Sequence, residues 1–290
     1  MKTSICLLMM LFLIVTDTYG QLERQRVVAA NPVELTFPTP RHIQLHTTEP
    51  LSKGELYYSI MHVFGTVDNG VSDFWGLDTG ANVRFSLEYG FTDRFSAFIG
   101  RSSLDKIYES GMRLHLLRQM TDGSVPVSVS LILSGGIITE DFTAFDIEMS
   151  LADRLQAGVS LPVARKFTDS FSLMATPMYA VFSDTNPLLR IEDERDTYYA
   201  GLGTGARYKL TNRTSFTFQH IFAYRTETGN HANTFGIGLD FETGGHVFQL
   251  FLTNNRSLND HYLLASDAGD ITDYAFRFGF NINRSFILRN

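Results

Sequence analysis

Apolar and polar residues alternate with a period of two over long stretches of this chain. Between residues 273 and 283, an aromatic or aliphatic residue recurs at every second position, and Ala, Arg, Gly or Asn stands between them. The same pattern returns in residues 81–89, 198–210 and 234–242. A helix, whose period is near 3.6 residues, cannot place such residues on two separate faces. The pattern therefore predicts an all-β fold.

About twelve segments show this alternation, and many are close to the roughly 9–11 residues that a tilted membrane-spanning strand needs. The third and fourth are the shortest or the least regular, and residues 142–153 fit either a strand extension or a short helix. Pro162 and Pro177 fall within two predicted strands, and we expect a bulge or a local break there because proline cannot donate to a ladder. The segments are residues 55–64, 80–90, 95–101, 110–118, 127–135, 154–164, 171–182, 197–209, 214–225, 233–242, 246–254 and 273–284.

Short and long connections alternate along the chain. Three short links read almost alike, at residues 91–94, 167–170 and 210–213, and each carries Asp or Asn, which favour tight turns. Residues 121–123 and 243–245 form two further short links. This order predicts an up-and-down antiparallel transmembrane β-barrel with short periplasmic turns and long extracellular loops. The longer connections are residues 65–79, 101–109, 136–153, 183–196, 226–232 and 255–272.

The first twenty residues are typical of a secretory signal peptide. Lys2 supplies a positive charge, residues 5–15 are apolar without a break, and residues 18–20 offer small residues to a signal peptidase. We expect cleavage before Gln21. The only cysteine, Cys6, lies in this leader, so a disulfide scaffold and a cysteine-based metal site are excluded from the exported chain.

Three regions follow from these signals. Residues 1–20 are the signal peptide, and residues 55–290 are a single β-barrel domain. Residues 21–54 contain four prolines, which keep the stretch irregular, and we expect a periplasmic extension that folds back toward the barrel mouth.

The composition favours a membrane over water. The polar faces of the strands carry mostly Gly, Ser, Thr and Asn, whereas the outer face of a soluble β-sandwich is rich in charge. Aromatic residues make up 13% of the chain and suit an interfacial girdle, and mean hydropathy is close to zero. We expect a barrel in the outer membrane of a Gram-negative bacterium, in contact with its lipid. The alternative is a soluble periplasmic or secreted β-protein that binds a lipid or a small ligand.

Several blocks resemble a known family. They are residues 62–65 (HVFG), 74–78 (FWGLD), 88–94 (EYGFTDR), 244–250 (GGHVFQL) and 278–284 (FGFNINR). The chain is similar to the barrel family of Bacteroidota catalogued as domain of unknown function 5777, over nearly its whole exported length. The resemblance implies an outer-membrane β-barrel and carries no assigned activity.

No pattern in the chain indicates an enzyme, a cofactor or a metal site. No histidine is followed by Ser two residues later, as in the barrel type of phospholipase, and no Gly-x-Ser-x-Gly elbow occurs. His42 and His46 are close in sequence but lie in the proline-rich stretch. His62 and His220 fall in phase with lipid-facing residues, and such costly exceptions would mark a protein contact within the membrane.

A set of polar residues falls on the inner faces of the predicted strands. Mixed charges in a narrow lumen favour a self-satisfied network that fills the barrel, and the alternative is the lining of a polar channel. Either way we expect no nucleic-acid partner, since the net charge is −7, and a small solute or an envelope protein remains open. The candidate lumen residues are Arg84, Glu88, Arg113, Arg207, Asp240, Arg277 and Asn281.

Overall fold

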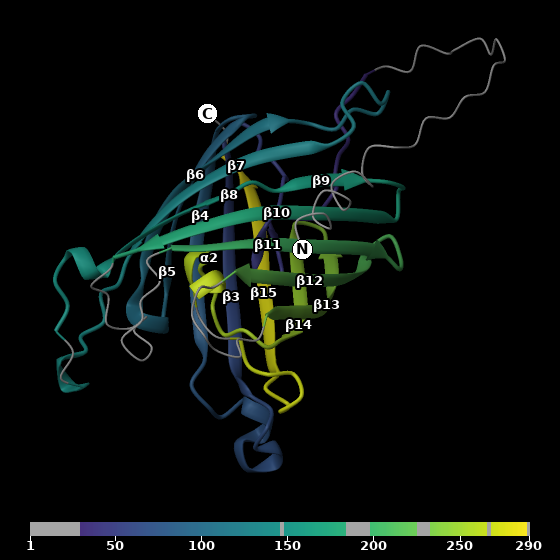
Figure 1. The fold of residues 1–290 in the computed structure, drawn as a ribbon. Helices are drawn as coiled ribbons and strands as arrows, with labels where there is room; N and C mark the ends of the chain where they lie inside the picture. The colour runs from purple at the N-terminus through teal and green to yellow at the C-terminus, as the bar shows by residue number, and fades with distance from the viewer. Residues whose placement is uncertain (1–29, 146–147, 184–197, 225–232, 266–267, 289–290) are drawn as a thin grey trace, which may run out of the picture.

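The computed structural model describes residues 30–145, 148–183, 198–224, 233–265 and 268–288 (Figure 1). The expected signal peptide, with its cleavage site before Gln21, lies outside the described residues. Most of the two long connections expected after the seventh and ninth strands also lies outside them.

One antiparallel sheet closes on itself into a barrel, and this confirms the predicted fold class. Each strand pairs with its neighbours in chain order, and β15 pairs with β3 to complete the ring. Two short strands, β8 and β9, share one position between β7 and β10, so the barrel has twelve positions. The strands are β3 (Glu55–Thr66), β4 (Asn82–Thr92), β5 (Phe95–Ser102), β6 (Tyr108–Leu117), β7 (Ser128–Ile137), β8 (Leu155–Ser160), β9 (Val163–Lys166), β10 (Phe171–Phe182), β11 (Tyr198–Lys209), β12 (Thr214–Tyr224), β13 (Thr234–Thr243), β14 (His246–Thr253) and β15 (Arg277–Ile287).

The alternation of the sequence becomes two faces of the wall. In β3, every second residue from Tyr57 to Gly65 is buried on the inner face, and the residues between them are partly exposed on the outer face. The same two-residue pattern runs through β10, where the inner face carries Ser172, Thr176 and several apolar residues. Among the described residues no helix has the length and hydropathy of a membrane span.

The connections follow the expected order of short and long links. The structure differs from the prediction in the details of two of the long connections. The ambiguous residues 142–153 contain two short 3-10 helices, η3 (Thr143–Phe145) and η4 (Ala152–Arg154). The last strand begins four residues later than predicted because Asp270 caps a turn through Thr272 N and Oγ1, at 2.8 and 2.7 Å.

The two prolines produce the local break that the sequence predicts. Strand β8 ends at Ser160 and β9 begins at Val163, with Pro162 between them. The break lies opposite Pro177 of β10, whose carbonyl accepts from Leu161 N at 3.0 Å. Proline is tolerated here because the ladders that β8 and β9 form with β7 and with β10 are both interrupted at the gap.

The proline-rich N-terminal stretch goes further than the predicted periplasmic extension that folds back toward the barrel mouth, because part of it enters the barrel. Residues 36–48, here called the N-terminal insert, are buried inside the ring of strands and carry the small hairpin β1 (Arg41–His42) and β2 (Leu45–His46). The insert enters at the short-turn rim, where Val33 N donates to Gln119 O at 2.7 Å. It returns to the same rim, where Gly54 N donates to Gly90 O at 2.8 Å.

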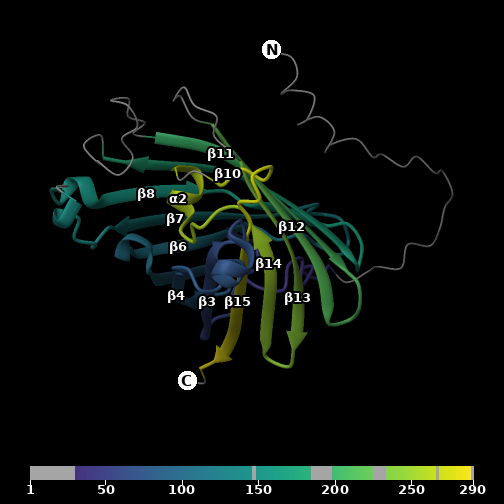
Figure 2. The ribbon, with the colours of Figure 1, turned by 90° about the horizontal axis from the view of Figure 1, so that it is seen from below.

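A second segment fills the barrel from the opposite rim. Residues 254–265 of the connection between β14 and β15, here called the loop insert, carry α2 (Asp260–Ala265). Five residues of α2 are buried, and the helix packs against β8, β10, β11 and β12 (Figures 1 and 2). An apolar cluster joins both inserts to the wall, with Phe37 and Leu45 from the first and Leu263 and Leu264 from the second.

Glycines of β11 make room for the inserts. A Cβ at Gly203 would lie 3.0 Å from Leu45, and one at Gly205 would lie 3.0 Å from His42. The sequence predicts that these glycines accommodate side chains of opposite strands. The side chains nearest to these two positions belong instead to the N-terminal insert, with Met178 and Met174 of β10 next to them.

Gly201→Ala is expected to lower the free energy of unfolding by about 1–3 kcal/mol, the usual cost of overpacking a filled interior. The new Cβ would lie 2.4 Å from Leu264 Cδ2 and 2.7 Å from the Phe222 carbonyl oxygen, so a backbone must shift. Urea titration of the refolded barrel measures the change. Gly244→Ala is the control, because nothing lies within 4 Å of a Cβ there. Equal stability of the two variants would contradict the close packing.

Candidate functional site

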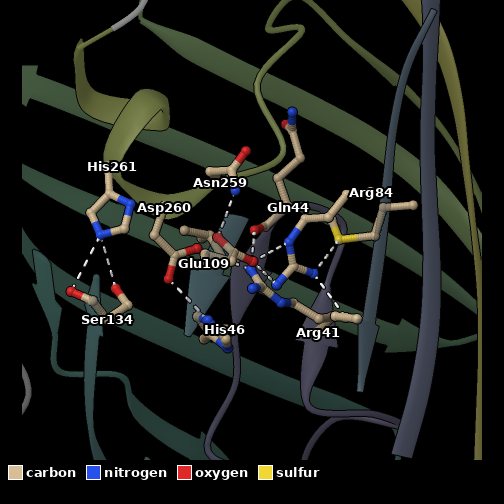
Figure 3. Close-up of polar contacts among 12 residues, drawn as sticks. Arg41, Gln44, His46, Arg84, Glu109, Ser134, Asn259, Asp260 and His261 are labelled. Carbon is tan, nitrogen blue, oxygen red and sulfur yellow. Dashed lines mark hydrogen bonds and ion pairs between the residues drawn. The ribbon is translucent and has the colours of Figure 1, made fainter. Parts of the chain in front are cut away.

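The two inserts meet in the middle of the barrel at one carboxylate. Asp260 of the loop insert accepts from Arg41 Nη1 at 2.9 Å, and its other oxygen lies 2.9 Å from His46 Nε2 (Figure 3). All three residues are buried. A single side chain from one rim therefore holds two side chains that enter from the other rim.

The tip of the N-terminal insert strengthens this junction. Gln44 donates from Nε2 to the carbonyl oxygens of Asn255 and Ser257, at 2.9 and 2.7 Å. Its backbone N–H donates to Gln219 Oε1 of β12 at 2.9 Å. The neighbouring Ile43 has φ of 54°, a strained conformation for a β-branched residue, and its carbonyl accepts from Asn281 Nδ2 at 2.7 Å. The surrounding contacts thus hold the tip in one conformation.

Arg84 lies on the inner face of β4 and forms an ion pair with Glu109 of β6. Glu109 also accepts from Asn259 Nδ2 of the loop insert at 2.6 Å. Arg84 donates to Ser86 Oγ at 2.9 Å, so its charge is satisfied within the wall. This pair fixes the loop insert to the β4–β6 side of the barrel.

Arg113 and Glu88 form a third buried ion pair, with Nε and Oε1 2.8 Å apart. Arg113 also donates to the carbonyl oxygen of Thr47 and contacts His46 Nδ1 at 2.8 Å. Glu88 accepts from Ser96 Oγ at 2.6 Å. The pair fixes the N-terminal insert to the wall.

The remaining predicted lumen residues divide into two groups. Arg207 forms an ion pair with Glu242, near the short-turn rim, while Asp240 accepts from Gln249 Nε2 at 3.1 Å. Arg277 is half-buried at the opposite rim, at the start of β15, and takes part in none of these clusters. The structure thus brings Arg113, paired with Glu88, and Asn281 into contact with the N-terminal insert. It ties Arg84 to the loop insert through Glu109 and leaves Arg277 apart.

Burial controls the charge of the histidines in the N-terminal insert. It lowers the pKa of His42 and of His46 from 6.5 to about 4, so both are neutral near pH 7. Burial would raise the pKa of Asp260, but its contacts with His46 and Arg41 hold that pKa below its ordinary range. At neutral pH the junction is therefore an ion pair between Arg41 and Asp260, with a neutral imidazole beside it.

Stability is expected to fall as the pH drops from 7.5 to 5, in part because of His42. The unfolded chain takes up a proton near pH 6.5, whereas the folded chain resists until about pH 4. The wild type should therefore lose about 2 kcal/mol relative to the His42→Gln variant over this interval. Urea midpoints at both pH values give the difference. Parallel pH profiles of the two proteins would show that His42 is not buried in neutral form.

One Ser–His contact has the residue types of a catalytic pair. Ser134 Oγ of β7 lies 3.1 Å from His261 Nε2 of α2 (Figure 3). No hydrogen-bond partner is found for His261 Nδ1 within the described part of the chain, so nothing orients the imidazole as a base. The enclosed cavity beside the pair is about 10 Å³, which suits one water molecule. The contact holds α2 against the wall.

The described residues contain no group of three or more His, Cys, Asp or Glu side chains placed as metal ligands. His62 and His220 lie on the outer face, where their phase puts them. The ring of His62 stacks on Phe280 at 4.9 Å, and that of His220 contacts Phe222 at 4.0 Å. Aromatic neighbours thus cover part of each polar ring.

Sequence reasoning missed the partners that make the network. Asp260 and Asn259 lie in a long connection, and Arg41, Gln44 and His46 lie in the irregular stretch. One signal was available: residues 254–261 form an almost unbroken polar run, which is unusual for a loop that packs inside a protein.

Comparisons with known proteins agree with this fold. The family described as membrane bound beta barrel domain, domain of unknown function 5777, matches residues 37–286. No curated protein matches the sequence. Three solved structures are similar to the barrel, each at low identity. They are an outer membrane channel from Pseudomonas putida F1 (14% identity, 82% of this chain and 98% of that chain, TM-score 0.50), the KdgM porin (9%, 80% and 99%, 0.46) and outer membrane phospholipase A from Escherichia coli (13%, 84% and 95%, 0.41).

The family match covers most of the chain, and the closed antiparallel ring with its aromatic outer face is the structure that such a match requires. The protein belongs to the membrane bound beta barrel domain family, domain of unknown function 5777.

Proposed function

We propose that this protein is a non-enzymatic outer-membrane barrel whose lumen is held shut by its two inserts and admits a small solute when they move. The observation that carries the proposal is the junction at Asp260. Two segments that enter from opposite rims fill the lumen and contact each other there through Arg41 and His46. In a purely structural barrel, side chains of the strands could fill the lumen alone. A separate insert, in contrast, can move out of the lumen.

The contacts of the N-terminal insert suit a segment that can be displaced. Among the described residues, its charged contacts with the wall and the loop insert are limited to Arg113 and Asp260, and against β11 it packs Leu45 and His42 over glycines, which present no side chain to hold it. Its two ends reach the same rim, near Gln119 and Gly90. The insert can therefore withdraw through that rim without unthreading the chain.

The short-turn rim is assigned to the periplasm in this proposal. The barrel has an even number of positions, so the first strand begins and the last strand ends at that rim. There Leu288 N donates to Gly54 O at 2.9 Å. In bacterial outer-membrane barrels the short turns are periplasmic and the long loops extracellular. The N-terminal insert would then be accessible to an envelope partner.

Single-channel recording in planar bilayers tests the proposal. The wild type is expected to show little or no steady conductance. A variant in which residues 36–48 are replaced by a flexible Gly/Ser linker of equal length should conduct. A heat-modifiable band on a denaturing gel must show that both barrels are folded. A folded variant that stays as closed as the wild type would overturn the proposal.

A further inference from the structure

Most arginines inside the barrel are neutralised by a carboxylate of the network. Each of four guanidinium groups lies within ion-pair distance of one acid, so the interior is close to balanced in charge. The pairs are Arg41 with Asp260, Arg84 with Glu109, Arg113 with Glu88, and Arg207 with Glu242. Two other arginines, Arg256 and Arg277, have no such partner among the described residues.

Arg256 lies at the long-loop rim, near the start of the loop insert. Its carbonyl oxygen accepts from Asn82 Nδ2, at the start of β4, at 2.9 Å. Its Nη2 lies 3.9 Å from the position of a Cβ at Gly80. The side chain is half-buried, and Nε is buried without a hydrogen-bond partner.

Arg277 lies at the same rim, on the neighbouring side of β3. It is the first residue of β15 and pairs in register with Thr66. Its position is in phase with Gly279 and Asn281, so the side chain belongs to the inner face. Nη1 reaches the Phe64 carbonyl oxygen at 3.4 Å, and Nε is buried without a partner.

Both arginines reach the same end of β3: Arg277 Nη1 contacts the Phe64 carbonyl oxygen, and the Arg256 carbonyl oxygen is hydrogen-bonded to Asn82, which pairs in register with the adjacent Val63. At this separation the positive charge of Arg256 acts on Arg277. Among the described acids, Asp68 acts electrostatically on Arg277 and Asp105 acts on Arg256. Neither carboxylate comes within 4 Å of a nitrogen of Arg256 or Arg277. These two arginines therefore form no ion pair with a described residue. Two like charges with buried, unsatisfied donors are costly, and an anion that accepts from both removes that cost.

We propose that Arg256 and Arg277 together bind the oxyanion group, a carboxylate or a phosphate, of a small solute at the long-loop rim of the barrel. Guanidinium groups suit this role because each presents several donors in a plane that matches two oxygens. The site deepens the proposed function by naming a class of solute, and it rests on that function only for the step from binding to passage.

Calorimetric titration with inorganic phosphate, at low ionic strength and in an uncharged detergent, tests the site. Saturable binding is expected in the wild type and should weaken about tenfold or more in Arg256→Gln and in Arg277→Gln. Arg101→Gln is the matched control: this arginine is near the same rim, but its guanidinium stacks on Tyr108 at 5.4 Å. Phosphate binding should be unchanged there. If a Gln variant does not fold, the Lys variant at that position should bind with intermediate affinity.

A second arm separates a free solute from a lipid headgroup. The barrel is reconstituted in phosphatidylcholine vesicles with or without phosphatidylglycerol, and phosphate binding is compared. Competition by the anionic lipid would identify a headgroup as the source of the oxyanion, and no competition would identify a soluble anion. The site would be overturned if folded wild type did not bind phosphate, or if both Gln variants bound it as tightly as the wild type. These binding measurements do not depend on conductance. The anion site and the closed lumen can therefore fail independently of each other.

Discussion

Asp260→Ala is expected to lower the free energy of unfolding by about 3–5 kcal/mol, the usual cost of leaving one partner of a buried ion pair alone. Arg41 is 3% exposed and has no other carboxylate among its described contacts. Within the described residues, the other hydrogen bond of its guanidinium is to the Gln44 carbonyl oxygen at 3.1 Å. The junction would then be held by neutral hydrogen bonds only, and brief openings should become more frequent in planar bilayers.

Asp169→Ala is the matched control for this change. Asp169 is exposed in a short turn, and its loss should alter stability by no more than about 0.5 kcal/mol. Urea titration in lipid vesicles measures both variants. If Asp260→Ala were as stable as Asp169→Ala, Asp260 could not be the contact between the two inserts.

The Arg113→Met variant is expected to lose a similar amount, about 3–5 kcal/mol, because Glu88 would be left charged and buried. The Thr47 carbonyl oxygen would also lose its donor. Unlike Asp260→Ala, this change removes the charged attachment of the N-terminal insert to the wall and leaves the junction in place. The loss should appear in the same urea titration.

A double variant distinguishes the lost pair from a general packing defect. Adding Glu88→Gln to Arg113→Met removes the uncompensated charge and should restore more than half of the loss. Arg94→Met, at an exposed turn position, serves as the control for an arginine without a partner acid. Additive losses in the double variant would mean that Glu88 and Arg113 do not act as a pair.

The wall of the barrel could be predicted from the sequence because each wall residue has only two environments. The strict period of two places Arg84, Glu88 and Arg113 on the inner face without any knowledge of which strands pair. The partners could not be found in the same way. Glu109 falls one residue before the predicted start of its strand, and Asp260 lies in no strand.

The inserts could not be predicted because they lack the features that reveal a strand or a helix. The N-terminal insert is buried on all sides, so it has no exposed face and no hydrophobic period. Wall side chains satisfy its polar backbone groups. For example, Gln219 Oε1 accepts from Leu45 N at 3.1 Å. Prolines and histidines in that stretch therefore look like a solvated extension, although the surrounding barrel supplies their partners.

Accessibility of Leu45 tests the filled lumen most directly. Leu45 is 0% exposed within the N-terminal insert, whereas Leu35 is 49% exposed just before it. Cys6 is the only native cysteine, so a single Cys can be introduced into a background with Cys6→Ser. In the folded barrel, Leu35→Cys should react with a bulky water-soluble maleimide, and Leu45→Cys should react only after heat unfolding. Equal labelling of both positions in the folded protein would contradict the filled lumen.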